Sequence, residues 1–292
     1  MTDLKEKDKT DDVRHIRLHV IGEDKTGVIA AFTNYLFTNN GNIVDLDQAA
    51  RRGLFKMTAH AEFPAASFDR ARMEAELIAL GKTVGMAVSF ERELADRRRR
   101  IVILVTKEAH CLERLQSDYA SADSPGEIVG VFGNHPSLRP VAKKAGIPFE
   151  DIAGPDQSDN EKRIIDLLDE YRADLVVLAK YMRILSPDVV WRYEQRMINI
   201  HHSLLPAFPG ASAYRQAFEK GVKLIGCTAH YVTTDLDQGP IINQEAFRVE
   251  PHMTMKDIIQ KGFETEAICL SKAVRLHLTG NLSIHWGKVY GC

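Results

Sequence analysis

An asparagine, a histidine and an aspartate that suit acyl chemistry lie on nearby segments in the second half of the chain. Asn199 and His201 belong to NIHHSLLPAFPG, residues 199–210, and Asp237 belongs to HYVTTDLDQGPII, residues 230–242. An amide donor, an imidazole and a carboxylate can together activate a nucleophile and stabilise the oxyanion that forms at a carbonyl carbon. The two segments therefore predict one site for reaction at a carbonyl.

Each of these residues has a role in that chemistry. Asn199 is expected to donate an N–H to the developing oxyanion, an effect worth about 10²–10³ in rate. A histidine titrates at a pKa of about 6.5, and a nearby carboxylate favours its charged form. Asp237 is therefore expected to hold His201 protonated and to order the attacking water. Taken singly, the same residues also suit a strand cap, a structural histidine and an ordinary Asx turn.

The histidines do not predict a metal site. His201 and His202 are adjacent, so their side chains do not converge on one ion, and the chain has no HExxH segment. A zinc site made of His201, His230 and Asp237 is the alternative. We expect no metal and no cofactor.

The composition is that of an ordinary globular protein with two domains. Of the 292 residues, 45% are hydrophobic and 27% are charged, and the net charge of −2 lacks the basic excess of a nucleic-acid binder. The 4 cysteines are scattered without a CxxC, which indicates free thiols in a reducing compartment. The apolar runs are too short to cross a membrane. Residues 1–13 are charged and have no apolar core of a secretory signal. The sequence therefore predicts a disordered tail and a cytoplasmic protein.

Residues 14–90 predict a small domain in the order β-α-β-β-α-β, the ferredoxin-like arrangement. Strands are expected near residues 16–20, 42–48, 54–63 and 84–90, and helices over residues 28–36 and 67–80. The second helix is expected to be capped by Ser67 and to end before Gly81, and Arg52 and Gly53 are expected to form a hairpin turn.

The segments GEDKTGV in the first turn of this domain and GNIVDLDQ at its second strand resemble those of an ACT domain. The resemblance implies a regulatory and oligomerisation domain that responds to an amino acid. The effector contacts that it implies are Asp24, Thr26, Gly27 and Asn42. A dimerisation module without a ligand is the alternative.

Residues 91–100 are expected to be a linker. They include a run of arginines over residues 97–100. Such a run in a chain of balanced charge indicates a solvated linker or an interface contact rather than a nucleic-acid site.

Residues 101–292 predict a doubly wound, mostly parallel α/β sheet. Short apolar runs suited to buried strands alternate with helical stretches, and residues 223–232 and 241–249 are long enough for an antiparallel pair. Residues 254–278 predict a long helix. No GxGxxG follows the first strand, so the dinucleotide fingerprint is absent.

The two site segments and AKYMRIL, residues 179–185, together resemble the folate-dependent formyltransferase family. Its glycinamide ribonucleotide members have the same Asn-x-His and Asp-x-Gly-Pro elements. The ACT-like domain, and His202 and Lys180 where transformylases usually have Pro and Gly, resemble its formyltetrahydrofolate deformylase branch. The resemblance implies hydrolysis of 10-formyltetrahydrofolate to tetrahydrofolate and formate, which balances the one-carbon folate pool for purine synthesis.

The resemblance also implies a homo-oligomer that binds a small folate substrate and neither nucleic acid nor membrane. The catalytic residues that it implies are Asn199, His201 and Asp237. The substrate-binding residues that it implies are Met182, Arg183, Leu185, His202 and Lys180. Formyl transfer to an amine such as glycinamide ribonucleotide, and a folate-binding amino-acid sensor without catalysis, are the alternatives.

Overall fold

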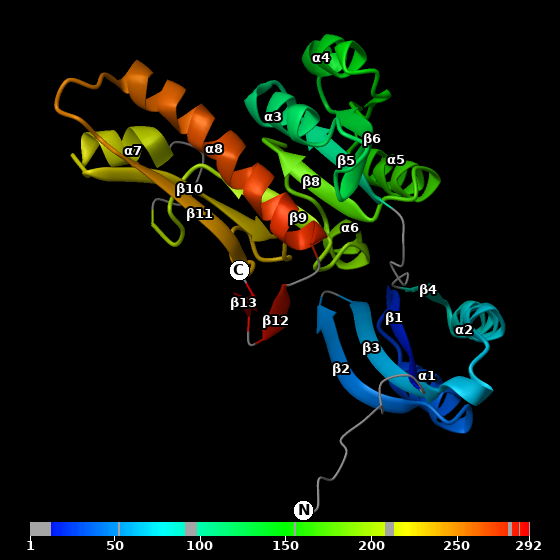
Figure 1. Ribbon diagram of the computed structural model, residues 1–292. Helices are drawn as coiled ribbons and strands as arrows, with labels where there is room; N and C mark the ends of the chain where they lie inside the picture. The colour runs from blue at the N-terminus through cyan, green and yellow to red at the C-terminus, as the bar shows by residue number, and fades with distance from the viewer. Residues whose placement is uncertain are drawn as a thin grey trace, which may run out of the picture. The chain divides into compact units, whose positions relative to one another are not determined.

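The computed structural model describes residues 13–51, 53–90, 98–154, 156–207, 213–279, 282–285 and 287–291 (Figure 1). The chain divides into two compact units, residues 1–95 and 96–292. The expected tail up to residue 12, the turn residue Arg52, and Pro209 and Gly210 lie outside the described residues. Among the described residues, no helix is long and apolar enough to cross a membrane.

The first unit has the predicted β-α-β-β-α-β order. Its elements are β1 (Val13–Glu23), α1 (Val28–Thr38), β2 (Asn42–Arg51), β3 (Leu54–Pro64), η1 (Ala65–Ser67), α2 (Arg70–Val84) and β4 (Met86–Phe90). The strands pair antiparallel in the order β2-β3-β1-β4. Apolar side chains from the sheet and both helices form one core, which includes Leu18, Phe32 and Leu77.

Helix α2 begins and ends later than the sequence predicted. Its N-cap is Asp69, whose carboxylate accepts a first-turn backbone N–H at 3.0 Å, and not Ser67. The helix continues through Gly81 and ends at Gly85, which has a left-handed φ of 72°. A Cβ on Gly81 would lie 2.4 Å from Val88 Cγ2. The glycine at position 81 therefore allows α2 to pack closely on β4 and does not end the helix.

The second unit contains a mostly parallel sheet with helices on both faces. Its elements are β5 (Arg99–Val105), α3 (His110–Asp118), β6 (Gly126–Gly133), η2 (Pro136–Leu138), α4 (Arg139–Lys144), β7 (Phe149–Asp151), α5 (Gln157–Glu170), β8 (Leu175–Ala179), α6 (Pro187–Arg192), β9 (Met197–His201), α7 (Ala213–Glu219), β10 (Leu224–Tyr231), β11 (Ile241–Arg248), α8 (Met255–Leu278), β12 (Ser283–His285) and β13 (Lys288–Tyr290). The main sheet has the order β11-β10-β9-β8-β5-β6-β7. Strands β5 to β9 pair parallel, and β10 pairs antiparallel with β9 and β11.

The predicted doubly wound sheet is therefore confirmed, with an antiparallel pair at one edge. Strand β7 and the β12–β13 hairpin were not predicted. Each of these strands is 3 residues long, and so short a run shows no clear hydrophobic period.

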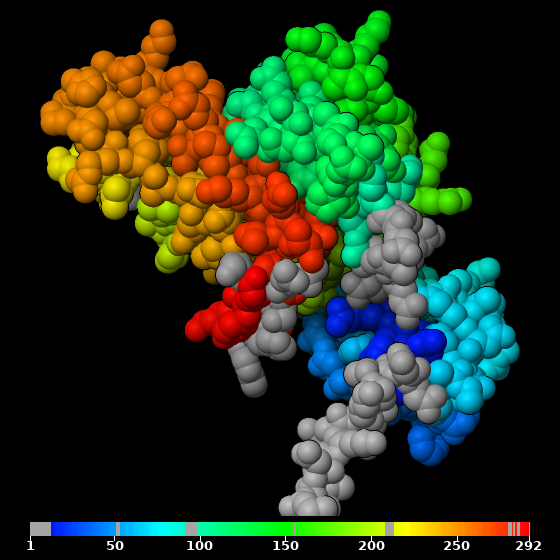
Figure 2. All heavy atoms as spheres, in the orientation of Figure 1, coloured from blue at the N-terminus to red at the C-terminus, as the bar shows by residue number. Residues whose placement is uncertain are grey.

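Strand β5 shows how both sheet faces are buried. Alternate residues of a strand point to opposite faces. Ile101, Ile103 and Val105 join the core that α3 and α8 cover, and the two helices lie next to each other on the face seen in Figure 2. Val102 and Leu104 join the core that α5 and α6 cover. A continuous apolar run is what a strand buried on both faces requires.

Strand β5 begins inside the segment that was expected to be a linker. The Arg98 guanidinium donates to the carbonyls of Ser121 and Gly126 at 2.9 and 2.8 Å. The Arg100 guanidinium donates to the carbonyl of Tyr171 at 2.7 Å. These two arginines therefore bind carbonyl groups of the second unit and do not form a solvated patch.

The order of the strands reverses at β5. Strands β6 and β7 lie on one side of β5, and β8, β9, β10 and β11 lie on the other. Open α/β sheets bind ligands at the carboxyl ends of strands where the order reverses in this way. The Met182 N–H donates to the Thr106 hydroxyl at 3.0 Å, which joins the loops that follow β8 and β5. This switch point marks the crevice in which a site is expected.

Candidate active site

Strands β9 and β10 place Asn199 beside a histidine. Asn199 and His230 are directly opposite each other in the antiparallel pair. Asn199 Nδ2 lies 3.3 Å from His230 Nε2, and His230 Nδ1 lies 2.9 Å from the carbonyl of Tyr231. Because a carbonyl only accepts, the neutral ring has its proton on Nδ1 and accepts from the Asn199 amide at Nε2. His230 therefore orients the carboxamide of Asn199.

Asp237 lies on the loop between β10 and β11 and reaches two imidazoles. Its Oδ2 lies 3.3 Å from His201 Nδ1, and its Oδ1 lies 3.7 Å from His230 Nε2. The charged form of His230, 3.7 Å away, lowers the pKa of Asp237, and the charge of His201 lowers it further, while burial opposes both. The carboxylate is therefore ionised at neutral pH.

The loop that carries Asp237 approaches β10 very closely. Asp237 has a left-handed φ of 56°, a conformation that aspartate adopts more readily than most residues. A Cβ on Gly239 would lie 1.6 Å from the carbonyl oxygen of Tyr231. Glycine at position 239 is therefore needed for the loop to pass along the strand and present the carboxylate.

His201 ends β9, and only 7% of it is exposed. Its Nδ1 faces Asp237, and its Nε2 is buried without a hydrogen-bond partner among the described residues. Burial lowers the pKa of His201 below 6.5; the Asp237 carboxylate raises it, and the neighbouring histidines and Lys180 lower it. The expectation that Asp237 keeps the ring protonated is therefore wrong, because burial outweighs the carboxylate. The neutral ring donates from Nδ1 and has its lone pair at Nε2.

Lys180 and His202 adjoin His201 and have protein partners. Lys180 follows β8 with a left-handed φ of 61°, and its Nζ lies 3.3 Å from Oε2 of Glu266. The His202 ring lies 5.2 Å from the ring of His201 and 5.5 Å, edge-on, from the ring of Tyr214. His202 and Tyr214 also line a cavity of about 190 Å³ beside β10 and α7.

Met182, Arg183 and Leu185 lie on the loop between β8 and α6, which follows the carboxyl end of β8. The side chains of Met182 and Ile184 are 54% and 66% exposed, whereas Leu185 packs against the core. The carbonyl of Ile184 accepts from Gln157 Nε2 at 2.9 Å, which ties the loop to α5. An anchored loop with exposed apolar side chains suits contact with a flat organic ligand.

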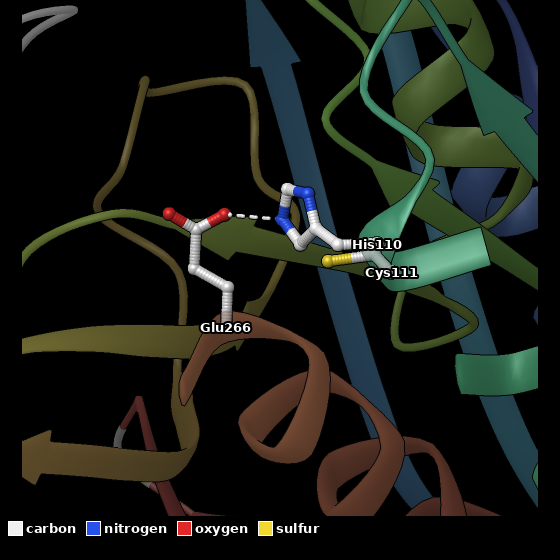
Figure 3. Close-up of side chains that lie close together, drawn as sticks. All are labelled: His110, Cys111 and Glu266. Carbon is white, nitrogen blue, oxygen red and sulfur yellow. Dashed lines mark hydrogen bonds and ion pairs between the residues drawn. The ribbon is translucent and has the colours of Figure 1, made fainter. Parts of the chain in front are cut away.

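Among the described residues, one group of side chains has the spacing of a metal site. Figure 3 shows His110, Cys111 and Glu266, whose ligand atoms lie within 4.8 Å of one another. Lys180 Nζ lies 3.3 Å from the same carboxylate, and burial raises the pKa of the Cys111 thiol. A cation beside the carboxylate and a thiol that stays protonated do not suit a metal ion. We interpret this group as an ion-pair cluster.

The first unit has a cavity of about 480 Å³ near the predicted effector contacts. Asp24, Thr26 and Gly27 line it, whereas Asn42 stands at the start of β2 and does not. Three further lining residues come from β2 and β3 and were not predicted: Gln48, Ala50 and Phe55. Strand pairing brings them to this turn, and the local sequence does not reveal that pairing.

The sequence analysis assigned no catalytic part to His230 and did not single out Glu266. His230 simply continues the pattern of a buried strand. Glu266 could have been predicted from its position on the helix. Gly262 and Leu270, four positions before and after it on α8, are buried, so Glu266 lies on the same face as they do. An acidic residue on the apolar face of a helix needs a buried partner.

Comparison with known proteins places both units in families. The formyl transferase family matches residues 99–274, and the ACT domain family matches residues 14–91. Formyltetrahydrofolate deformylase of Escherichia coli (strain K12) is 41% identical over 280 residues, which are 91% of this chain and 96% of the relative. The enzyme of the same name from Bacillus subtilis (strain 168) is 36% identical over 277 residues, 93% of this chain and 92% of the relative.

Solved structures agree with these matches. The formyltetrahydrofolate deformylase of Pseudomonas putida KT2440 has a TM-score of 0.64 and 34% identity, over 96% of this chain and 100% of that one. Glycinamide ribonucleotide transformylase 1 of Symbiobacterium toebii has a TM-score of 0.63 and 32% identity, over 68% of this chain and 97% of that one. The transformylase thus resembles part of this chain, whereas the deformylases match nearly all of it. With its ACT domain and its formyl transferase domain, the chain belongs to the formyltetrahydrofolate deformylase family.

Proposed function

We propose that this protein hydrolyses 10-formyltetrahydrofolate to tetrahydrofolate and formate. The observation that carries the proposal is the orientation of His201, with Nδ1 at Asp237 and with a buried Nε2 that has no hydrogen-bond partner among the described residues. An oriented neutral imidazole of this kind suits a general base. The names of the full-length relatives supply the substrate.

The reaction begins when His201 Nε2 takes a proton from water and the hydroxide oxygen bonds to the formyl carbon. Asn199, oriented by His230, donates to the oxyanion that forms. The Asp237 carboxylate stabilises the imidazolium through Nδ1–H. The C–N bond then breaks, and the proton on Nε2 passes to the leaving nitrogen. Formic acid loses its proton to water as formate leaves.

The folate is expected to bind at the switch point between β5 and β8. The exposed apolar side chains of the loop after β8 contact the pterin ring, and backbone groups near Met182, Arg183 and Leu185 contact its polar edge. Thr106 and Gln157 anchor this loop, so little conformational freedom is lost on binding. The enzyme needs no cofactor for this chemistry, because water is the second reactant.

The ACT domain is the proposed regulatory part. Its cavity of about 480 Å³ is large enough for an amino acid, and Asp24 at its rim provides a carboxylate for an ammonium group. We propose that the enzyme is a homo-oligomer in the cytoplasm. The formate that it releases there supplies purine synthesis.

The decisive experiment incubates the purified protein with 10-formyltetrahydrofolate alone and measures formate and tetrahydrofolate. Equal release of both by the wild type, lost in Asp237→Asn and retained in Asp235→Asn, is the expected result. Asp235 is exposed on the same loop, so this control matches the charge and the location. Wild-type turnover by Asp237→Asn would refute the mechanism, and no release by the wild type would refute hydrolysis.

Formyl transfer to an amine is the second candidate. The likeness to glycinamide ribonucleotide transformylase 1 of Symbiobacterium toebii over 68% of this chain favours it. The same assay with glycinamide ribonucleotide added would then yield a formylated amine, and formate would not appear without the acceptor. Folate binding without either product would instead identify a sensor.

A further inference from the structure

Glu266 is a buried carboxylate in the middle of helix α8, with an exposed fraction of 0%. Its Oε1 accepts from the Tyr214 hydroxyl at 2.6 Å. Its Oε2 lies 2.9 Å from His110 Nε2 and 3.3 Å from Lys180 Nζ. Burial opposes the charge, yet the His110 hydrogen bond, the Lys180 charge and the Tyr214 hydrogen bond lower the pKa of Glu266 to about 2. The carboxylate is therefore ionised at neutral pH.

The three partners of Glu266 come from three segments of the second unit. His110 begins α3, just after β5, and Lys180 follows β8. Tyr214 lies in α7, the helix that follows the Asn199–His202 segment in the chain. Because β5 and β8 are parallel neighbours, their carboxyl ends meet at the switch point. One buried carboxylate thus joins the crevice loops to the helix behind the histidine segment.

Two of these partners, Tyr214 and Lys180, act on the surroundings of His201. The Tyr214 ring packs edge-on against His202, which lies next to His201. The Lys180 ammonium lies close enough to His201 to disfavour its charged form. Charged and titratable groups that act on His201 are therefore Asp237, His202, His230 and Lys180.

We propose that Glu266 is a positioning residue for the hydrolytic site. Its carboxylate holds the Lys180 ammonium at the carboxyl end of β8 and anchors Tyr214 behind His202, and through these two residues it sets the place and the electrostatic environment of His201. The inference rests on the proposed function, because it assigns His201 the part of the base.

This arrangement predicts the direction in which each substitution shifts the pH dependence of activity. A base must be neutral to accept a proton. The fall of kcat/KM on the acid side of its pH profile, here called the acid limb, therefore follows the pKa of His201 in the free enzyme. Lys180→Met removes a cation, which favours imidazolium and moves the limb to higher pH. Glu266→Gln removes an anion and leaves Lys180 uncompensated, which moves the limb to lower pH. Each shift is expected to be roughly 0.5–1 pH unit, the scale of one partly screened charge.

The experiment measures kcat/KM for 10-formyltetrahydrofolate against pH in both variants and in Lys180→Arg. Arginine keeps the cation, so its acid limb should stay at the wild-type position while that of Lys180→Met rises. Matched controls are Glu264→Gln and Lys272→Met, which lie on α8 as Glu266 does and remove exposed ion pairs. These controls should leave the limb in place.

Unmoved limbs in folded Lys180→Met and Glu266→Gln, or shifts of both in one direction, would overturn the inference. If a single variant does not fold, the double variant Lys180→Met/Glu266→Gln is measured, because it leaves neither charge unpaired. It should keep a limb close to that of the wild type with kcat reduced about tenfold, the cost of a small misplacement. A wild-type kcat in the double variant would refute the positioning role. A wild type that releases no formate would instead refute the proposed function.

Discussion

The crevice of the second unit and the cavity of the first unit are built in contrasting ways. In the crevice, His201 and the side chain of Asp237 are nearly buried and lie 3.3 Å apart. In the cavity, Asp24, Thr26 and Gly27 are all exposed, and the lining combines charged and polar residues with small and apolar ones.

The contrast matches two different physical requirements. Acyl chemistry needs donors and charges that are already aimed at the reacting atoms and shielded from water, because such groups do not have to reorganise during the reaction. An effector site, which we propose for the cavity, has to fill and empty as the ligand concentration changes, and moderate affinity from a few exposed groups is enough. Substitutions should therefore have large effects in the crevice and small effects in the cavity.

The largest effect is expected for Asp237→Asn. Asparagine nearly preserves the shape of the residue but loses the charge that stabilises the His201 imidazolium, and it can present N–H to Nδ1. By analogy with other buried aspartate–histidine pairs, kcat should fall by roughly 10³–10⁴. Formate release at substrate saturation measures it, and circular dichroism verifies the fold. A fall of less than tenfold would remove the contrast between the regions.

Asn199→Ala should have the next largest effect. It removes one oriented donor to the oxyanion, so kcat should fall by about 10²–10³ with little change in folate affinity. Steady-state kinetics and equilibrium folate binding separate the two quantities. Equal losses in both would identify Asn199 as a group that binds the ground state instead.

The pH profile offers a smaller and more specific test. Because burial lowers the pKa of His201 below 6.5, the neutral base persists through neutral pH. Activity should be constant there and should fall as the pH drops through that lowered pKa. Wild-type kcat/KM measured through the acid and neutral range reports the midpoint. A midpoint above the ordinary histidine value would show that Asp237, and not burial, controls the ring.

Gly27→Ala should have the smallest effect. Gly27 has φ 86°, and a Cβ there would meet nothing within 4 Å, so the cost comes from the backbone alone. Left-handed alanine should lower the free energy of unfolding by about 1–2 kcal/mol and weaken amino-acid binding, with formate release unchanged. Gly146→Ala, with φ 71° and equally open space in the second unit, is the matched control. Urea unfolding and calorimetric titration with amino acids measure both effects, and a loss of turnover in Gly27→Ala would contradict the separation of the regions.

Much of the fold could be predicted because its periods are strong and long. The 5-residue run of β5 that is buried on both faces, and the 24-residue α8 with its Thr254 capping box, are recognisable without tertiary information. The end of α2 was misplaced because Gly81, which looks like a stop signal, is needed for packing against β4. Local chemistry does not distinguish these two uses of glycine.

The amino-acid sequence alone predicted Asn199, His201 and Asp237 as a set, because residue type and spacing are properties of the chain. Tertiary structure decided how the set is connected. The pairing of β9 with β10 brought His230 to Asn199, and α8 brought Glu266 to Lys180. It also lowered the pKa of His201, since burial depends on everything packed around the ring. Burial and long-range pairing arise from distant segments, so no local pattern contains them.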